Sequence, residues 1–210
     1  MTPPVQFFFL LVLVTCATTV RAVETGAPVP GSDLAIHLSV ANEVMTVSTY
    51  PEITITLINH GTRKATLVLP GDGSERGWRT PIIGWAVKSS DDLTPYPKEV
   101  PLNTRPRCGD MNALERSEII SLDPGTSVTL SSAERPRLIT PGRFHIRFYY
   151  LNVPNCGWNG GDLGHASDDA MQAMRASTPC FIISDELSVT VIGRPNVQEG
   201  PVPLPDRTAK

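Results

Sequence analysis

Residues 34–40 read Leu-Ala-Ile-His-Leu-Ser-Val, and residues 52–58 read Glu-Ile-Thr-Ile-Thr-Leu-Ile. In both stretches large apolar residues alternate with polar or small ones. This two-residue period is typical of a β-strand that buries one of its faces. The side chains expected to face the core are Leu34, Ile36, Leu38 and Val40 in the first stretch and Ile53, Ile55 and Leu57 in the second.

The same pattern recurs along the rest of the chain. The further predicted strands are 65–69, 82–88, 118–122, 126–131, 144–151 and 186–192. Between them, Asn-His-Gly at 59–61 and Asp-Pro-Gly at 123–125 supply residues that preset turns or tolerate positive φ. About eight short strands joined by such turns predict an all-β fold in which two antiparallel sheets pack face to face.

One short helix is expected, at residues 167–175. Ser167 can cap it, and Asp168 and Asp169 would face the positive end of the helix dipole. Met171 and Met174 fall on one face of this helix. We interpret the two methionines as packing residues and not as metal ligands.

The chain divides into four parts. Residues 5–14 are almost continuously apolar, long enough for the core of a signal peptide and too short to span a bilayer. We therefore expect a signal peptide at 1–22, a linker at 23–33, the sandwich domain at 34–192 and a disordered tail at 193–210, which is rich in proline. The alternatives for the apolar run are a lipoprotein signal that acylates Cys16 and a buried N-terminal strand or helix. A secreted or periplasmic location follows from the signal peptide.

The amino-acid composition limits the kinds of partner that this chain can bind. The chain has 210 residues, of which 40% are hydrophobic and 19% charged, so it can bury a substantial core. Its formal net charge is −3, which offers no clustered basic face for a nucleic acid. We expect an unknown protein or small ligand as partner, no nucleic acid, no cofactor and no membrane span in the mature chain.

Three cysteines remain after removal of the leader. They are Cys108, Cys156 and Cys180, and export would place them where disulfides persist. A Cys156–Cys180 bridge is preferred, because Cys156 closely follows the strand that ends at Asn152 and Cys180 opens the strand that runs to Ile192. The bridge would tie the two ends of one long loop and contribute about 3 kcal/mol. Pairing of Cys108 with either partner is the alternative. No two cysteines have the spacing of a zinc knuckle.

The final part of the domain resembles a known family. Leu-Asp-Pro-Gly at 122–125 and Pro-Gly-Arg-Phe at 141–144, which leads into His-Ile-Arg-Phe-Tyr-Tyr, are similar to the closing strands of bacterial secreted immunoglobulin-like domains. Domains related to the intracellular proteinase inhibitor of bacilli share this ending. The resemblance implies an immunoglobulin-like β-sandwich of about 7–9 strands with long inserted loops. Phe144 stands where tyrosine is usual, and no reactive inhibitory loop can be matched residue by residue.

Three long connections, at 70–81, 89–117 and 153–179, exceed what a minimal sandwich needs and are where a function could sit. Trp78 and Arg79 in the first connection, and Trp158 and His165 in the last, are the candidate ligand contacts. The structural alternative is that Trp78 closes one end of the core while Arg79 pairs with an acid of its own loop.

The last connection also offers metal ligands. Asp162, His165, Asp168 and Asp169 carry suitable donor atoms, but their spacing matches no defined metal loop, and solvated acids beside a helix start explain them equally well. In the usual immunoglobulin order this loop would share a pole with His60.

No enzyme motif is present: the chain has no Gly-x-Ser-x-Gly elbow and no His-Glu-x-x-His. His37 and His145 are expected on outward faces as structural residues. The leading hypothesis is an exported, non-catalytic binding or scaffold module. The alternatives are a secreted proteinase inhibitor that acts through a loop such as 70–81, and a metal-binding extracytoplasmic protein.

Overall fold

A computed structural model describes five stretches of the chain. They are residues 33–71, 79–101, 114–131, 135–154 and 166–193. The predicted signal peptide, nearly all of the predicted linker and tail, and the candidate residues Trp78, Trp158 and His165 lie outside these stretches, as do Cys108 and Cys156.

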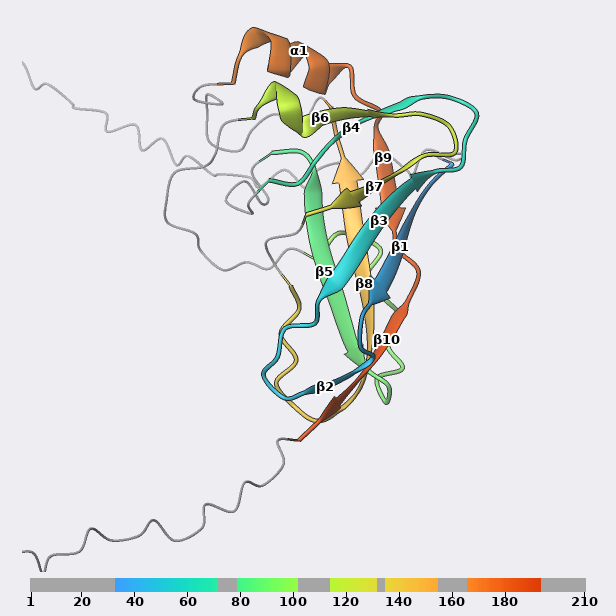
Figure 1. Cartoon of the computed structure of the whole chain (residues 1–210), viewed down its shortest axis with the longest axis vertical. Helices are drawn as coiled ribbons and strands as arrows, with labels where there is room; N and C mark the ends of the chain where they lie inside the picture. The colour runs from blue at the N-terminus through green and yellow to red at the C-terminus, as the bar shows by residue number, and fades with distance from the viewer. Residues whose placement is uncertain (1–32, 72–78, 102–113, 132–134, 155–165, 194–210) are drawn as a thin grey trace, which may run out of the picture.

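The first sheet has three antiparallel strands in the order β1-β3-β7. Their bounds are Leu34–Val40 for β1, Ile53–Asn59 for β3 and Ser127–Leu130 for β7. In the register of β1 with β3, Ile36 stands opposite Leu57 and Ala35 opposite Ile58. β3 is central, so β1 and β7 form the two edges of this sheet, which lies in front in Figure 1.

The second sheet has five strands. Its path is β2-β10-β8-β5, and β9 also pairs with β8. The bounds are Val44–Thr46 for β2, Ile82–Ser89 for β5, Gly142–Asn152 for β8, Cys180–Ile183 for β9 and Leu187–Ile192 for β10. All of these pairings are antiparallel except that of β2 with β10, which is parallel.

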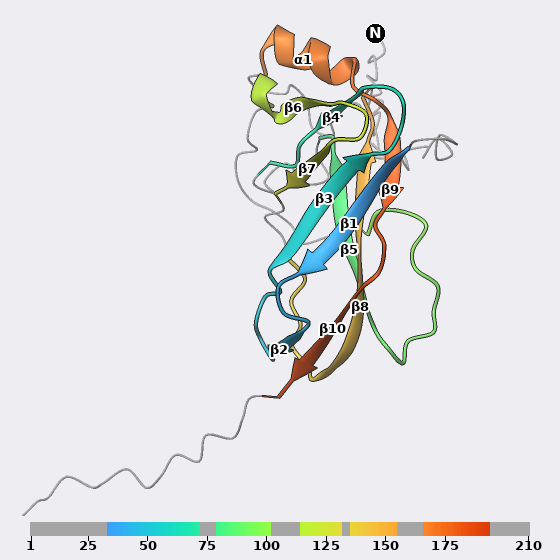
Figure 2. The same ribbon diagram turned by 45° about the vertical axis from the view of Figure 1, so that its right-hand side comes forward.

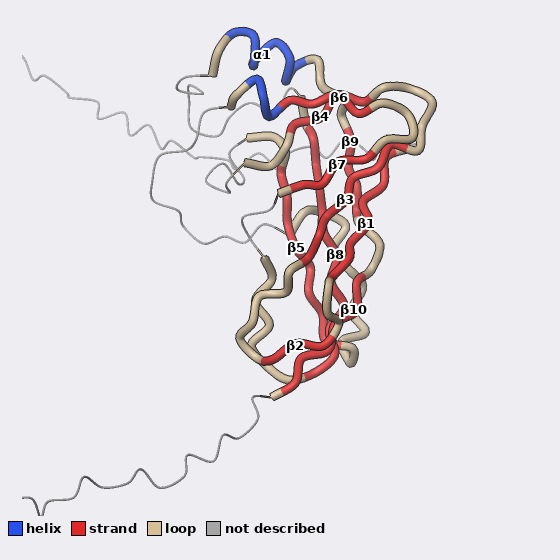
Figure 3. The backbone as a smooth tube through the Cα atoms, viewed as in Figure 1, coloured by secondary structure: helices blue, strands red, loops and turns tan. Residues whose placement is uncertain are grey.

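A small cap covers one end of the two sheets, as Figure 3 shows. It consists of the strand pair β4 (Ala65–Val68) and β6 (Ile119–Leu122), the 3-10 turn η1 (Arg116–Glu118) and the helix α1 (Asp168–Arg175). Val68, Ile119, Ala170 and Met174 are buried together beneath the helix. The cap therefore has its own apolar cluster.

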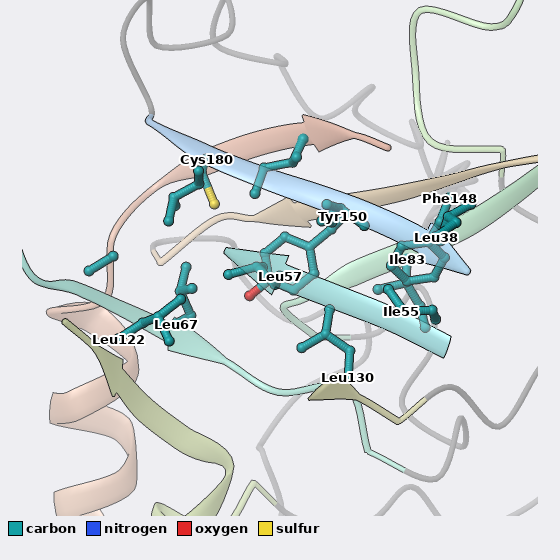
Figure 4. Close-up of a cluster of buried hydrophobic side chains, with 14 residues drawn as sticks. Leu38, Ile55, Leu57, Leu67, Ile83, Leu122, Leu130, Phe148, Tyr150 and Cys180 are labelled. Atoms are coloured by element: carbon teal, nitrogen blue, oxygen red, sulfur yellow. The ribbon is translucent and has the colours of Figure 1, made fainter. Parts of the chain in front are cut away.

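The main core lies between the two sheets. Leu57 of β3 and Phe148 and Tyr150 of β8 have no exposed surface, and the cluster also takes side chains from β1, β5, β7 and β9. In Figure 4 these side chains fill the space between the strands. The hydroxyl of Tyr150 donates to the carbonyl oxygen of Val68 at 2.7 Å, so the one polar atom that it brings into the core has a partner.

The outer face of the five-stranded sheet is partly covered by the chain that follows β5. A side chain at Gly84 would lie 2.5 Å from the carbonyl oxygen of Pro101, so this position requires glycine. Ala86, Val100 and Tyr149 are buried there, and the Tyr149 hydroxyl donates to the carbonyl oxygen of Pro97 at 3.0 Å. The loop is seen beside β8 and β10 in Figure 2.

The sequence predicted most of these elements. An all-β fold with antiparallel sheets is confirmed, and the predicted strand at 34–40 has the same bounds as β1. Ser167 caps α1 by accepting from the backbone N–H of Ala170 at 3.2 Å, as predicted. Gly125 has φ of 72°, as the predicted turn requires. Gly61 is needed for a different reason, because a side chain there would lie 2.7 Å from the carboxylate of Asp33.

Two features differ from the prediction. The strand β2 was not expected, and the segment expected to run as one strand from Cys180 to Ile192 is broken between β9 and β10. The strand partners explain the break. Tyr149 is opposite Ile183 and Ile146 is opposite Leu187, so the three residues 184–186 face only two residues of β8. This extra residue is a β-bulge, which bends the strand.

Core packing is tested by Leu57→Ala, which removes a fully buried side chain between the sheets. We expect the free energy of unfolding, measured by urea denaturation, to fall by about 2–5 kcal/mol. Thr54→Ala, on the exposed face of the same strand, is the control and should change it by no more than about 0.5 kcal/mol. Similar losses in the two variants would contradict the assignment of the faces.

Candidate functional site

Arg79 is the one sequence-predicted contact residue within the described stretches, and it is buried. Its side chain has no exposed surface, and its Nη2 donates to Oε1 of Glu118 at 2.6 Å. The other carboxylate oxygen of Glu118 accepts from the backbone N–H of Glu115 at 2.8 Å. Arg79 therefore pairs with an acid 39 positions away in the cap. Asp72 and Glu75, the acids of its own loop, lie outside the described stretches.

Cys180 carries a free thiol on the inward side of β9. Burial raises the pKa of this thiol to about 12, so it is protonated and unreactive at neutral pH. The expected bridge to Cys156 is thus not present at Cys180, and Cys156 itself lies outside the described stretches. Cys180 packs with the apolar side chains of the main core, where a thiol behaves as a small hydrophobic group.

A hollow of about 390 Å³ lies on the side of the molecule where β1 approaches β9. We call it the Ala35 hollow, and its lining residues are Leu34, Ala35, Ile36, His37, Ile58, His60, Ile182, Ile183 and Asp185. Figures 1 and 2 show β1 and β9 side by side in both views. Most of the lining is aliphatic, and its polar side chains are two imidazoles and one carboxylate.

Strand pairing explains why the surface is hollow at this place. Ala35 stands opposite Ile58, and His37 follows two positions later on the same face of β1. The backbone N–H of His60 donates to the carbonyl oxygen of Asp33 at 2.7 Å, which places His60 at the other end. The two histidines are thus four residues apart along the sheet, or about 13 Å. The short side chain of Ala35 lies between them.

Asp185 fixes the orientation of His37. Oδ2 of Asp185 lies 2.6 Å from Nδ1 of His37, and Oδ1 accepts from the backbone N–H of Leu38 at 3.0 Å. A carboxylate can only accept hydrogen bonds, so Nδ1 of His37 carries the proton. In the neutral imidazole Nε2 then keeps its lone pair. Both side chains are about half exposed, at 58% for His37 and 49% for Asp185.

The β-bulge between β9 and β10 places Asp185 next to His37. Ser184 is bonded to β8 twice, because its N–H donates to the carbonyl oxygen of Phe148 and its hydroxyl accepts from the N–H of Phe148. The N–H of Asp185 donates to the carbonyl oxygen of Ile36 at 3.3 Å, so the chain turns from β8 toward β1 within one residue. Bulges commonly redirect a side chain in this way.

A second polar cluster lies on the outer face of the five-stranded sheet. The carboxylate of Glu186 lies 3.0 Å from Nδ1 of His145 and 3.7 Å from Nη2 of Arg147. The guanidinium carbon of Arg147 is 4.5 Å from the ring centre of Tyr96, and Nζ of Lys88 is 4.9 Å from it. Burial, more than the nearby Glu186 carboxylate, raises the pKa of Tyr96 to about 12. These contacts hold the loop after β5 against the sheet.

Comparison with known proteins identifies no relative: no family model, no curated protein and no solved structure matches this chain.

Within the stretches that the structure describes, no three histidine, cysteine or acidic side chains are grouped closely enough to hold a metal ion. The ligand set suggested at 162–169 is only partly described, since Asp162 and His165 lie outside these stretches. Of its remaining members, Asp169 lies 3.5 Å from Arg116. No helix in the described part of the chain is long and apolar enough to cross a membrane.

Sequence reasoning placed His37 correctly on an exposed face but assigned it no further role. Its partner Asp185 is 148 positions away, and no local pattern connects the two residues. The residues before Ser184, Cys-Phe-Ile-Ile at 180–183, show no alternation, so the change in burial phase is seen only in the structure. Inward side chains fall on even positions in β9 and on odd positions in β10, where Val189 and Val191 are buried.

The buried ion pair in the cap is tested by a double-mutant cycle with Arg79→Met and Glu118→Gln. Removing either partner leaves the other poorly solvated, so we expect each single change to lower the free energy of unfolding by about 3–5 kcal/mol. The double variant should lose less than the sum of the two. Urea denaturation measures all of these changes.

The control cycle uses Lys64→Met and Asp123→Asn. This pair, 3.0 Å apart, is more than half exposed on both sides, so each change should cost no more than about 1 kcal/mol. Equal losses in the two cycles would show that burial does not strengthen the Arg79–Glu118 pair.

The contact between Asp185 and β1 is tested by Asp185→Ala. We expect the amide of Leu38 to exchange with solvent at least tenfold faster in native-state hydrogen exchange, because it loses its acceptor. Asp185→Asn is the matched control and should keep this protection, because an amide oxygen also accepts. Unchanged exchange of the Leu38 amide in Asp185→Ala would contradict the contact.

Proposed function

We propose that this chain is an exported, non-catalytic binding module with an immunoglobulin-like fold, and that the Ala35 hollow is its ligand site. The apolar run at residues 5–14 supports export. The strand order supports the fold. β1, β3 and β7 correspond to strands A, B and E of an immunoglobulin domain, and β5, β8 and β10 to strands C, F and G.

The observation that carries the site is an oriented imidazole beside an aliphatic hollow. Ligand pockets are concave and mostly apolar, with a small number of polar groups in fixed positions. Here Ala35, Ile58 and Ile183 supply the apolar surface, and Asp185 holds His37 in one orientation. About half of each of these two polar side chains is open to solvent, so a ligand can reach them.

Binding is favoured over catalysis because, in the described part of the chain, no nucleophile is bonded to the imidazole of His37. A carboxylate and an imidazole in this arrangement can serve as a general base when a hydroxyl or thiol is bonded to the second ring nitrogen. Among the described residues, the only side chain bonded to His37 is that of Asp185. The free thiol of Cys180 is buried on the inward face of β9 and is protonated.

The proposal is tested by screening small molecules against the purified full chain, with the methyl groups of alanine and isoleucine observed by NMR. We expect at least one chemical class to shift the signals of Ala35, Ile58 and Ile183 together. Ala35→Leu fills the hollow and should abolish the shifts of Ile58 and Ile183, with the melting temperature changed by no more than about 3 °C.

Thr54→Leu is the matched control. It adds a larger apolar side chain to the same sheet face, at a position outside the hollow, and should leave the shifts unchanged. Failure of every chemical class to shift the three methyl groups, or equal shifts in Ala35→Leu, would overturn the assignment of the site.

A further inference from the structure

In the Ala35 hollow, Asp185 and His37 are held in defined orientations, and both present hydrogen-bond acceptors. The carboxylate of Asp185 accepts at both of its oxygens, from His37 and from the N–H of Leu38. Because this contact holds the proton of His37 on Nδ1, the ring nitrogen left for a ligand is Nε2, with its lone pair. A ligand that donates N–H groups matches these atoms.

The charge around the hollow favours the same kind of ligand. Asp185 lines the hollow and Asp33 is bonded to His60 through the backbone at its other end, while no lysine or arginine is among the described residues that line it. Arg63 and Lys64 follow in the turn after His60, and Lys64 is paired with Asp123 at 3.0 Å. With neutral imidazoles, the hollow itself therefore presents negative charge.

We propose that the Ala35 hollow binds a primary ammonium group carried on a short apolar chain, as in an alkylamine or a lysine side chain. The inference rests on the proposed function, which makes this hollow the ligand site. The chain packs on Ala35, Ile58 and Ile183, and the ammonium donates to Nε2 of His37. A carboxylate in the same place would meet a lone pair and the negative charge of Asp185.

The first experiment compares three probes of equal length: hexylammonium, hexanoate and 1-hexanol. Binding to the full chain is followed at about pH 8 by the methyl signals of Ala35, Ile58 and Ile183 and by the ¹⁵N signals of the His37 ring. We expect hexylammonium to bind with a dissociation constant of about 1 mM, at least tenfold tighter than the other two probes.

The second experiment converts Nε2 of His37 from a hydrogen-bond acceptor into a donor. In Asp185→Asn the new amide can accept from the Leu38 N–H and donate to Nδ1 of His37, which moves the imidazole proton to Nε2. The affinity for hexylammonium should then fall at least tenfold, and the ¹⁵N signals of His37 should report the other tautomer. Asp169→Asn removes an equal charge in the cap without contacting His37 and should change the affinity by less than about twofold.

The outcomes separate this inference from the proposed function. Equal or tighter binding of hexanol or hexanoate, with the same methyl shifts, would overturn the ammonium assignment and leave the hollow as a ligand site. No binding of hexylammonium would also overturn the ammonium assignment. The screen of other chemical classes would then still decide whether the hollow is a ligand site. Nα-acetyl-lysine methylamide tests the lysine side chain separately. Binding of this probe with the affinity of hexylammonium would extend the ligand class to lysine side chains. No binding of it would overturn that part of the assignment and restrict the class to simple alkylamines.

Discussion

The contact of Asp185 with β1 joins the two sheets along one side of the molecule. Its N–H and carboxylate bind the carbonyl oxygen of Ile36 and the N–H of Leu38, while the preceding Ser184 is bonded to β8. The open groups at the middle of this edge strand are thereby satisfied, which protects it against pairing with another strand. The recognition proposed for this side of the molecule therefore depends on the side chains of the hollow and not on strand addition.

The core on which this contact rests is apolar, and two buried asparagines at its edge have hydrogen-bond partners. Asn59 is 2% exposed, and its amide nitrogen donates to the carbonyl oxygens of Arg63 and Leu122. The amide nitrogen of Asn152 donates to the hydroxyl of Ser177 and the carbonyl oxygen of Thr178, and its amide oxygen accepts from the hydroxyl of Thr80. Such bonds avoid the cost of a buried polar group without a partner. They also fix the end of β3, which contributes Ile58 to the hollow, and the end of β8, which pairs with the β9 strand that lines the hollow.

The sequence was sufficient for the strands but not for the site. Two-residue alternation predicted β1 and β3 because each buries one face, whereas β2, with three residues, is too short to show a period. The bulge at 184–186 escaped prediction because apolar residues flank it on both sides. Arg79 was expected either to contact a ligand or to pair with an acid of its own loop, since nothing local shows that its partner Glu118 comes from the cap. The pairing of His37 with Asp185 depends in the same way on the tertiary fold.

A purely structural role for His37 accounts for less of the geometry. The two backbone contacts of Asp185 already hold β1, and neither of them needs an imidazole at position 37. What the bond to His37 adds is the choice of tautomer, which leaves Nε2 as an acceptor at a half-exposed site. Ala35 lies two positions before His37 on the same face of β1. Its cross-strand partner Ile58 is only partly buried, so an apolar surface lies open beside this acceptor. The combination is what a ligand with an apolar chain and a donor group requires.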